Sequence, residues 1–222
     1  MESGNANVNG FISDESSVSL TNKAVFSVVP KIKFADENNP YKLMDQDSTA
    51  MQLRLMYYDK SGGKDRVMFN LTWPQFAVLA KAVSMAMIFN IGDWDLAEKW
   101  DGPGHTSFTR IFGQPDADGL CQVRTLVLKR QSMRNGQVSQ YPWYIEIQTG
   151  RAVKVTAANG SGFMKSGTFI SDNKVSINLS DGMLWHHCYW GGQLMAVVTQ
   201  MMKNNVLTGY KKIVSAVKSF KK

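Results

Sequence analysis

The chain has 222 residues, 44% of them hydrophobic, which is enough for a real core and excludes a globally disordered protein. Lys and Arg outnumber Asp and Glu by 25 to 18, and the resulting formal net charge of +7 favours a polyanionic partner. The two cysteines do not make a disulfide framework and no segment resembles a signal peptide or a membrane span, so we expect a cytoplasmic protein that does not contact membranes.

The first third of the chain predicts a leader and a small antiparallel sheet. Residues 1–22 are rich in Ser, Asn and Gly, which predicts a flexible leader. Ala24–Phe34 is apolar and β-branched but contains Pro30, which indicates an edge strand. Met51–Tyr58 alternates apolar with other residues, and a turn at Gly62-Gly63 leads into the next strand.

A strand followed by a capped helix then occurs twice. Arg66–Thr72 matches Lys174–Ser180, and in each copy a hydroxyl residue precedes a long apolar segment. In the first copy Thr72 and Gln75 form a capping-box pattern, which predicts that a helix begins there. The repetition predicts a fused pair of sheet-plus-helix units.

The second half predicts the same elements with longer loops. A Gly- and Pro-rich bridge contains a short strand at about Ser107–Phe112, and a helix is expected over Asp181–Asn204. A hairpin pairs Cys121–Arg130 with a strand through Trp143 and Ile147, around an Asn135-Gly136 turn. We further expect a turn at Thr149–Arg151, a strand over Ala152–Thr156, a loop over Ala158–Gly167 and a last strand at Val175–Leu179.

These elements predict an α+β protein of two pseudo-repeated antiparallel β-sheet-plus-helix units of the ββββα type. We expect a single domain over residues 23–205, with the repeats at about 23–92 and 105–205. Residues 206–222 predict a basic amphipathic C-terminal helix. For this helix three arrangements are open: it packs on the body of the protein, it contributes to an interface between protomers, or it lies on an anionic membrane.

The functional signal is distributed over the predicted strands and their turns. Cations can follow phosphates while aromatic rings stack on bases, which suits single-stranded nucleic acid. The alternative is an ordinary solvated sheet face. The candidate nucleic-acid-binding residues are Arg54, Tyr58, Arg66, Arg124, Lys129, Arg130, Arg134, Tyr144, Arg151, Lys154 and Lys174.

The hairpin from Lys129 to Tyr144 gives a more specific hypothesis. Its loop holds Lys129, Arg130 and Arg134 and is too polar to be core, so it can close over a strand that lies on Arg124 and Tyr144. The alternative is an ordinary solvent-exposed hairpin.

Other motifs do not support catalysis or metal binding. His186, His187 and Cys188 are adjacent, so on a helix their side chains diverge, and no second Cys/His pair completes a zinc site. Gly162–Thr168 has the glycine spacing of a phosphate loop, but no Lys stands between the second glycine, Gly167, and Thr168. Trp143 shares the parity of Ile145 and Ile147, which favours a core position. We expect no enzyme, no cofactor, no metal and no small-molecule substrate.

The repeated strand-Asn-Leu-Ser/Thr-helix unit resembles the single-stranded-DNA-binding fold of the plant Whirly proteins and of the eukaryotic positive transcription cofactor, including short relatives in phages and conjugative elements. The resemblance covers about Met51–Asn205 and is carried by Val67–Thr72, Cys121–Gln148 and Val175–Ser180, with the helices that follow the first and last. It implies nucleic acid lying across the face of an antiparallel sheet. The Lys-Gly-Lys-Ala stretch typical of Whirly proteins is absent, and so is an acidic C-terminal tail.

The expected function is largely sequence-independent binding of single-stranded DNA, by a homo-oligomer, in replication, recombination or transfer of a phage or mobile element. The alternatives are an RNA-binding or transcription-regulating module on the same fold, or a structural or assembly protein whose basic face contacts an acidic protein.

Overall fold

The computed structural model describes residues 17–20, 24–31, 50–58 and 64–203. The chain begins with a four-stranded antiparallel sheet, sheet 1, whose strands lie side by side in chain order. They are β1 (Ser17–Leu20), β2 (Ala24–Lys31), β3 (Ala50–Tyr58) and β4 (Lys64–Thr72). Helix α2 (Trp73–Phe89) follows directly, and the capping box between Thr72 and Gln75 at its start is confirmed.

A second antiparallel sheet, sheet 2, repeats this order of strands. Its four main strands lie in the order β6 (Phe108–Phe112), β7 (Leu120–Arg130), β10 (Trp143–Thr156) and β12 (Ile170–Leu179), and helix α4 (Asp181–Lys203) follows. β5 (Trp94–Asp95) pairs with the end of β7, and β11 (Gly162–Met164) pairs with the end of β10. The mixed α+β class with antiparallel sheets is therefore confirmed.

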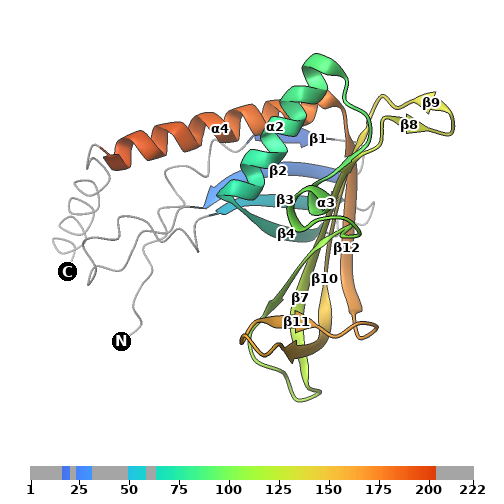
Figure 1. The fold of residues 1–222 in the computed structure, drawn as a ribbon, viewed down its shortest axis with the longest axis vertical. Helices are drawn as coiled ribbons and strands as arrows, with labels where there is room; N and C mark the ends of the chain where they lie inside the picture. Colours follow the sequence, from blue (N-terminus) through green and yellow to red (C-terminus); the bar gives the residue numbers. More distant parts are fainter. Residues whose placement is uncertain (1–16, 21–23, 32–49, 59–63, 204–222) are drawn as a thin grey trace.

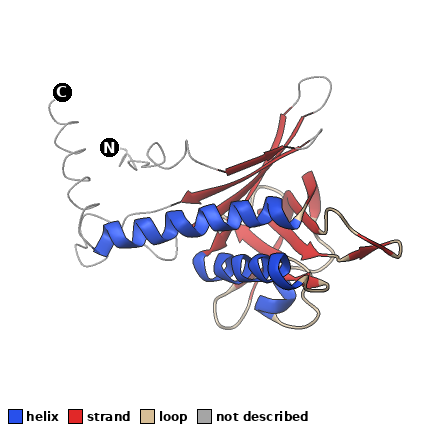
Figure 2. Ribbon diagram, turned by 90° about the horizontal axis from the view of Figure 1, so that it is seen from above, coloured by secondary structure: helices blue, strands red, loops and turns tan. Residues whose placement is uncertain are grey.

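The two sheets and two long helices share one hydrophobic core. Figure 1 shows α2 and α4 in front of sheet 1, while the strands of sheet 2 run nearly perpendicular to those of sheet 1. From above, the two helices lie side by side along the sheets (Figure 2). Trp143, predicted from its parity to be core, is fully buried there together with Phe26, Phe69 and Phe76.

Close approach of α4 to the core depends on a glycine. A Cβ atom added at Gly191 would lie 2.8 Å from Phe76 Cζ and 2.9 Å from Met51 Cε, whereas one added at Gly192 would meet nothing within 4 Å. The first of the two glycines therefore lets the helix backbone contact the core directly.

Several local predictions were wrong or incomplete. β1 lies within the segment expected to be a flexible leader. The turn expected at Thr149–Arg151 does not exist, because β10 continues through it with a β-bulge in its pairing with β12. β5, helix α3 (Leu96–Asp101) and β11 were not expected from the sequence. The basic helix expected over 206–222 lies outside the described residues.

The hairpin turn at Asn135-Gly136 is confirmed. Both residues have positive φ, 52° and 77°, as a two-residue hairpin turn requires. β8 (Met133–Arg134) and β9 (Gln137–Val138) flank the turn and pair only with each other. They form an arm, residues 131–142, that projects from the body in Figure 1.

Candidate nucleic-acid interface

The face of sheet 1 opposite the helices carries Arg54 on β3 and Arg66 on β4. Alternation along the strands turns Leu53, Leu55 and Val67 into the core and these arginines away from it. Burial, and then the positive charge of Arg66, lower the pKa of Arg54. Arg54 Nε donates to Gln52 Oε1 at 2.7 Å, and among the described side chains neither arginine has an acidic partner.

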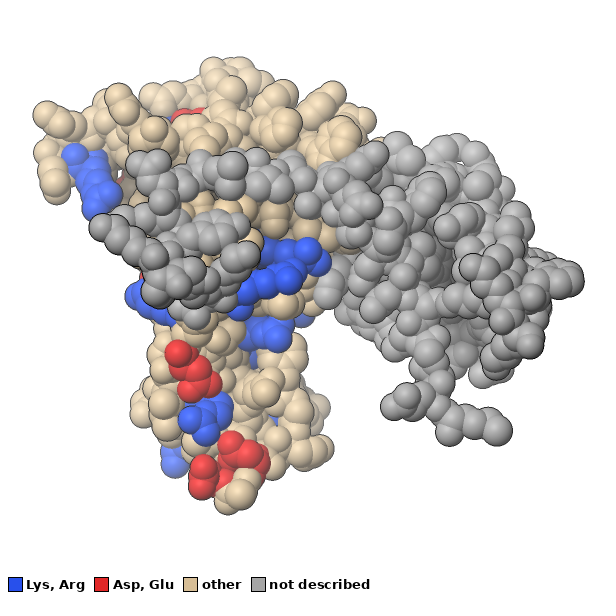
Figure 3. All heavy atoms as spheres, turned by 180° about the vertical axis from the view of Figure 1, so that it is seen from behind, with Lys and Arg blue, Asp and Glu red and all other residues tan. Residues whose placement is uncertain are grey.

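Lys and Arg gather visibly on the back of the molecule. Figure 3 shows a band of them across its middle, with acidic side chains lower down and part of the surface covered by grey atoms. Figure 3 views the molecule from behind, whereas α2 and α4 lie at the front in Figure 1, so the band lies on the side away from these helices. Tyr58, a further candidate, ends β3, but its side chain is outside the described part of the structure.

The outer face of sheet 2 carries four of the predicted residues, and two of them, Tyr144 and Lys174, contact the carboxylate of Glu146. Lys129 and Tyr144 are direct partners across β7 and β10, with the ammonium 5.8 Å from the ring centroid. Glu146 accepts a hydrogen bond from the Tyr144 hydroxyl and forms an ion pair of 2.8 Å with Lys174. Lys154 is exposed farther along the same face, where its stem covers Gly162.

This carboxylate sets the protonation states of its neighbours. Burial acts to raise the pKa of Glu146, but hydrogen bonds from Lys174, Tyr144 and Gln148 outweigh burial and lower it. The pKa of Lys174 is raised by the same contact, while burial and then Glu146 raise the pKa of Tyr144. Tyr144 thus stays a neutral hydroxyl, and Lys174 is a charged residue already partly neutralised.

Two predicted residues lie on the other face of sheet 2. Arg124 pairs with Thr149 and therefore has the parity of Leu126 and Ile147, so it faces the side of the core. Tyr144 lies on the opposite face, so one strand cannot lie across both as the hairpin hypothesis assumed. Arg151 shares the face of Arg124, where it forms ion pairs with Asp172 at 3.6 Å and Asp116 at 4.0 Å.

Arg130 is a structural residue, which corrects its assignment to the binding surface. Only 3% of its side chain is exposed. It forms a two-pronged ion pair with Asp181, at 3.0 Å for each prong, and donates to the carbonyl oxygens of Ile91 and Gly92 beyond the end of α2. Its guanidinium is therefore unavailable to a phosphate.

The arm itself is exposed, as expected, and firmly attached. Asp93 Oδ1 accepts two hydrogen bonds of 2.8 Å from Ser132, one from the backbone N–H and one from the hydroxyl. Arg134 is exposed on one side of the arm, while Met133 and Val138 are partners on the other side and are 53% and 74% exposed.

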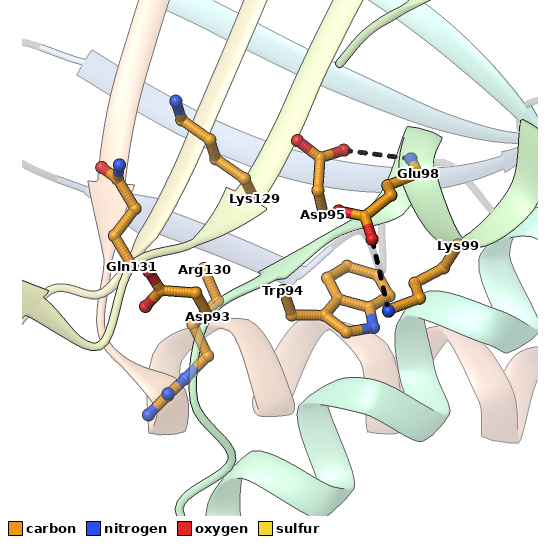
Figure 4. A pocket seen from close by; sticks show the side chains of 8 residues that line it. All are labelled: Asp93, Trp94, Asp95, Glu98, Lys99, Lys129, Arg130 and Gln131. Atoms are coloured by element: carbon orange, nitrogen blue, oxygen red, sulfur yellow. Dashed lines mark hydrogen bonds and ion pairs between the residues drawn. The ribbon is translucent and has the colours of Figure 1, made fainter. Parts of the chain in front are cut away.

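A hollow lies between the base of the arm and α3 (Figure 4). Its carboxylates serve local structure: Asp93 binds Ser132, and Asp95 accepts from the backbone N–H groups of Ala97 and Glu98 as the N-cap of α3. The residues around it are Asp93, Trp94, Asp95, Glu98, Lys99, Lys129, Arg130 and Gln131. It presents no recognisable catalytic arrangement.

Within the described residues, no group of three or more His, Cys, Asp or Glu side chains could hold a metal ion. His187 is buried against Phe26 and His186 is exposed, so the two histidines diverge as helix geometry predicts. The described helices include none with the length and apolarity needed to cross a membrane.

Sequence reasoning missed Arg110. It lies on β6 directly opposite Arg124, and its parity with Phe108 and Phe112 in a five-residue strand was the available signal.

Comparison with known proteins finds only distant likenesses to solved structures. No family model and no curated protein matches the sequence. The plant transcriptional regulator PBF-2 is similar over 91% of this chain and 86% of its own, at 11% identity and a TM-score of 0.40. WHY3 from Arabidopsis thaliana is similar over 91% and 94% (12% identity, TM-score 0.37), and WHY1 from the same plant over 92% and 90% (12% identity, TM-score 0.34). Nothing about function rests on likenesses this distant.

Proposed function

We propose that this protein binds single-stranded DNA, largely without regard to sequence, on the sheet faces that are turned away from the shared core. The observation that carries the proposal is the pair Arg54 and Arg66. Two like charges near each other, with no described acidic partner, cost the folded state stability. A phosphate bound between them would remove that repulsion and gain charge-assisted hydrogen bonds.

The outer face of sheet 2 supports a single strand over a duplex. Tyr144 and Lys129 combine a ring with a cation, and each base stacked on an aromatic ring contributes roughly 1–3 kcal/mol. Stacking requires bases that are free of a paired strand. The process we propose, from the sequence resemblance alone, is protection or presentation of single strands in replication, recombination or transfer of a phage or mobile element.

We also propose that the protein is a homo-oligomer that associates through α2 and α4. Met85, Ile88 and Phe89 are 39%, 70% and 66% exposed on α2, and Trp185 and Tyr189 stack with ring centroids 5.0 Å apart on α4. Residues 182–202 of α4 include no Asp, Glu, Lys or Arg. Lys81 adds one cation to the exposed side of α2, so the face is mainly apolar, and such a face complements a second copy of itself rather than a highly charged partner.

Light scattering checks this association. The wild type should have a mass that is a multiple of 24.8 kDa, and Ile88→Glu with Phe89→Glu should shift it toward the single chain. A wild type that stays a single chain at micromolar concentration would contradict the interface.

The proposed binding is tested by Arg54→Gln combined with Arg66→Gln. Loss of two phosphate contacts should weaken binding of a fluorescent oligo(dT) and lower the salt slope by roughly 0.7 for each contact. Lys99→Gln combined with Lys165→Gln removes the same charge from exposed positions outside the proposed surface and should cost much less. Equal losses of affinity in the two double variants would mean that the effect comes from net charge and not from the positions of Arg54 and Arg66. Competition by RNA, duplex and heparin separates DNA binding from the RNA-binding reading, and no binding at low salt would favour an assembly role.

A further inference from the structure

Two arginines lie directly opposite each other where sheet 2 meets sheet 1. Arg110 on β6 and Arg124 on β7 are antiparallel partners, so their side chains leave the same face of the sheet as neighbours. Like charges directly across two strands destabilise a sheet. The chain nevertheless places these two arginines side by side.

Neither arginine is neutralised among the described residues. The hydrogen bond of Arg110 goes from Nη2 to the neutral amide oxygen of Gln75, at 3.4 Å. The nearby Asp116 and Asp172 form ion pairs with Arg151 instead. Burial lowers the pKa of Arg110, and no carboxylate compensates. Gln75 belongs to the first turn of α2, which has no acidic residue either.

Aromatic rings hold both guanidinium groups in place. Cζ of Arg110 is 5.5 Å from the ring centroid of Phe69, on the edge strand of sheet 1, and Cζ of Arg124 is 5.1 Å from that of Phe112. A guanidinium held over a ring keeps the N–H donors along its edge, the geometry that binds phosphate oxygens in pairs. Preorganised donors, and positive charge that no described carboxylate neutralises, together favour an anion.

We propose that Arg110 and Arg124 form a clamp for one phosphate of the bound strand, at the junction of the two sheets. The proposal rests on the proposed function and adds to it a residue, Arg110, and a second face of sheet 2. The strand would then leave the helix-free face of sheet 1 and pass this junction, beside the exposed ring of Phe112.

The test compares Arg110→Gln combined with Arg124→Gln against Arg151→Gln. Arg151 is an arginine of the same sheet face, but it is already paired with carboxylates. Oligo(dT) binding should weaken about tenfold in the double variant, as expected for loss of a charge-assisted contact, and should change little in Arg151→Gln. Arg124→Lys, which keeps the charge but loses the paired donors, should fall between the wild type and Arg124→Gln.

Thermal unfolding separates binding from a structural role. Relief of the repulsion should leave the Tm of the double variant unchanged or raise it. A lower Tm with wild-type affinity would overturn the clamp, and so would affinity equal to that of Arg151→Gln. If the wild type itself binds no oligo(dT) at low salt, the proposed function fails as well, so the two failures are distinguishable.

Discussion

Asp181→Ala should lower the free energy of unfolding by about 3 kcal/mol, because it leaves a buried arginine without its counter-charge. Asp181 accepts both prongs of Arg130 and also the indole N–H of Trp143, at 2.7 Å. These three residues join β7, β10 and the first turn of α4, and Arg130 also holds the chain beyond α2. Urea unfolding followed by tryptophan fluorescence measures the loss.

Asp172→Ala is the matched control. Its ion pair with Arg151 is exposed on both sides, and exposed pairs contribute about 0–1 kcal/mol. Equal losses in the two variants would show that the contacts of Asp181 do not tie the elements together.

The same carboxylate makes stability depend on pH. Burial acts to raise the pKa of Asp181, but the hydrogen bonds from Arg130 and Trp143 prevail and lower it. A depressed folded-state pKa means that the contribution is complete above the unfolded-state pKa and is lost as pH falls through the folded value. Wild-type stability should therefore decline on acidification below the usual range of an aspartate more steeply than that of Asp181→Ala.

Gly150→Ala should destabilise the protein by about 1–3 kcal/mol or more, because the added methyl group has no room. A Cβ atom there would lie 2.2 Å from the backbone oxygen of Ile170 and 2.8 Å from the ring of Phe169. A backbone oxygen cannot move without disturbing the pairing of β10 with β12 at the bulge. Thermal unfolding of the variant measures the effect.

Gly162→Ala makes a sharp control, since its Cβ atom would come almost as close to a neighbour, 2.4 Å from Lys154 Cε. That atom is near the end of a flexible, exposed side chain, which can turn away at little cost. Comparable destabilisation in both variants would mean that lack of space at Gly150 is not the cause.

The elements that the sequence predicted well are those fixed by neighbours in the chain. Thr72 and Gln75 form their capping box within one helical turn, and the Asn135-Gly136 turn depends on two residues that tolerate positive φ. Burial of Trp143 followed from alternation with Ile145 and Ile147. In each case the determining residues are within a few positions of one another.

The predictions that failed depend on partners distant in sequence. Arg130 looks like a loop cation until Asp181, 51 residues later, is folded against it. Arg130 has the parity of Leu126 and Leu128, which indicates a buried position, but parity does not show which carboxylate would neutralise the buried charge. Gly150 likewise resembles a turn residue, and only the approach of Ile170 shows why the continuous strand β10 needs glycine there.

The candidate site was predictable residue by residue but not as an arrangement. Alternation correctly turned Arg54 and Arg66 away from the core. It could not show that Glu146 would form an ion pair with Lys174, or that Arg124 and Tyr144 would lie on opposite faces of one sheet. These outcomes depend on the register between strands, which decides the face and the neighbours of each side chain and which no strand reveals on its own.

The measurement that tests the central claim most directly is a salt titration of the wild-type protein with oligo(dT) and with duplex DNA. We expect tighter binding of the single strand, with log affinity falling linearly with log salt by roughly 0.7 for each phosphate contacted. Affinity that does not change with salt, or that is equal for single strand and duplex, would contradict the account.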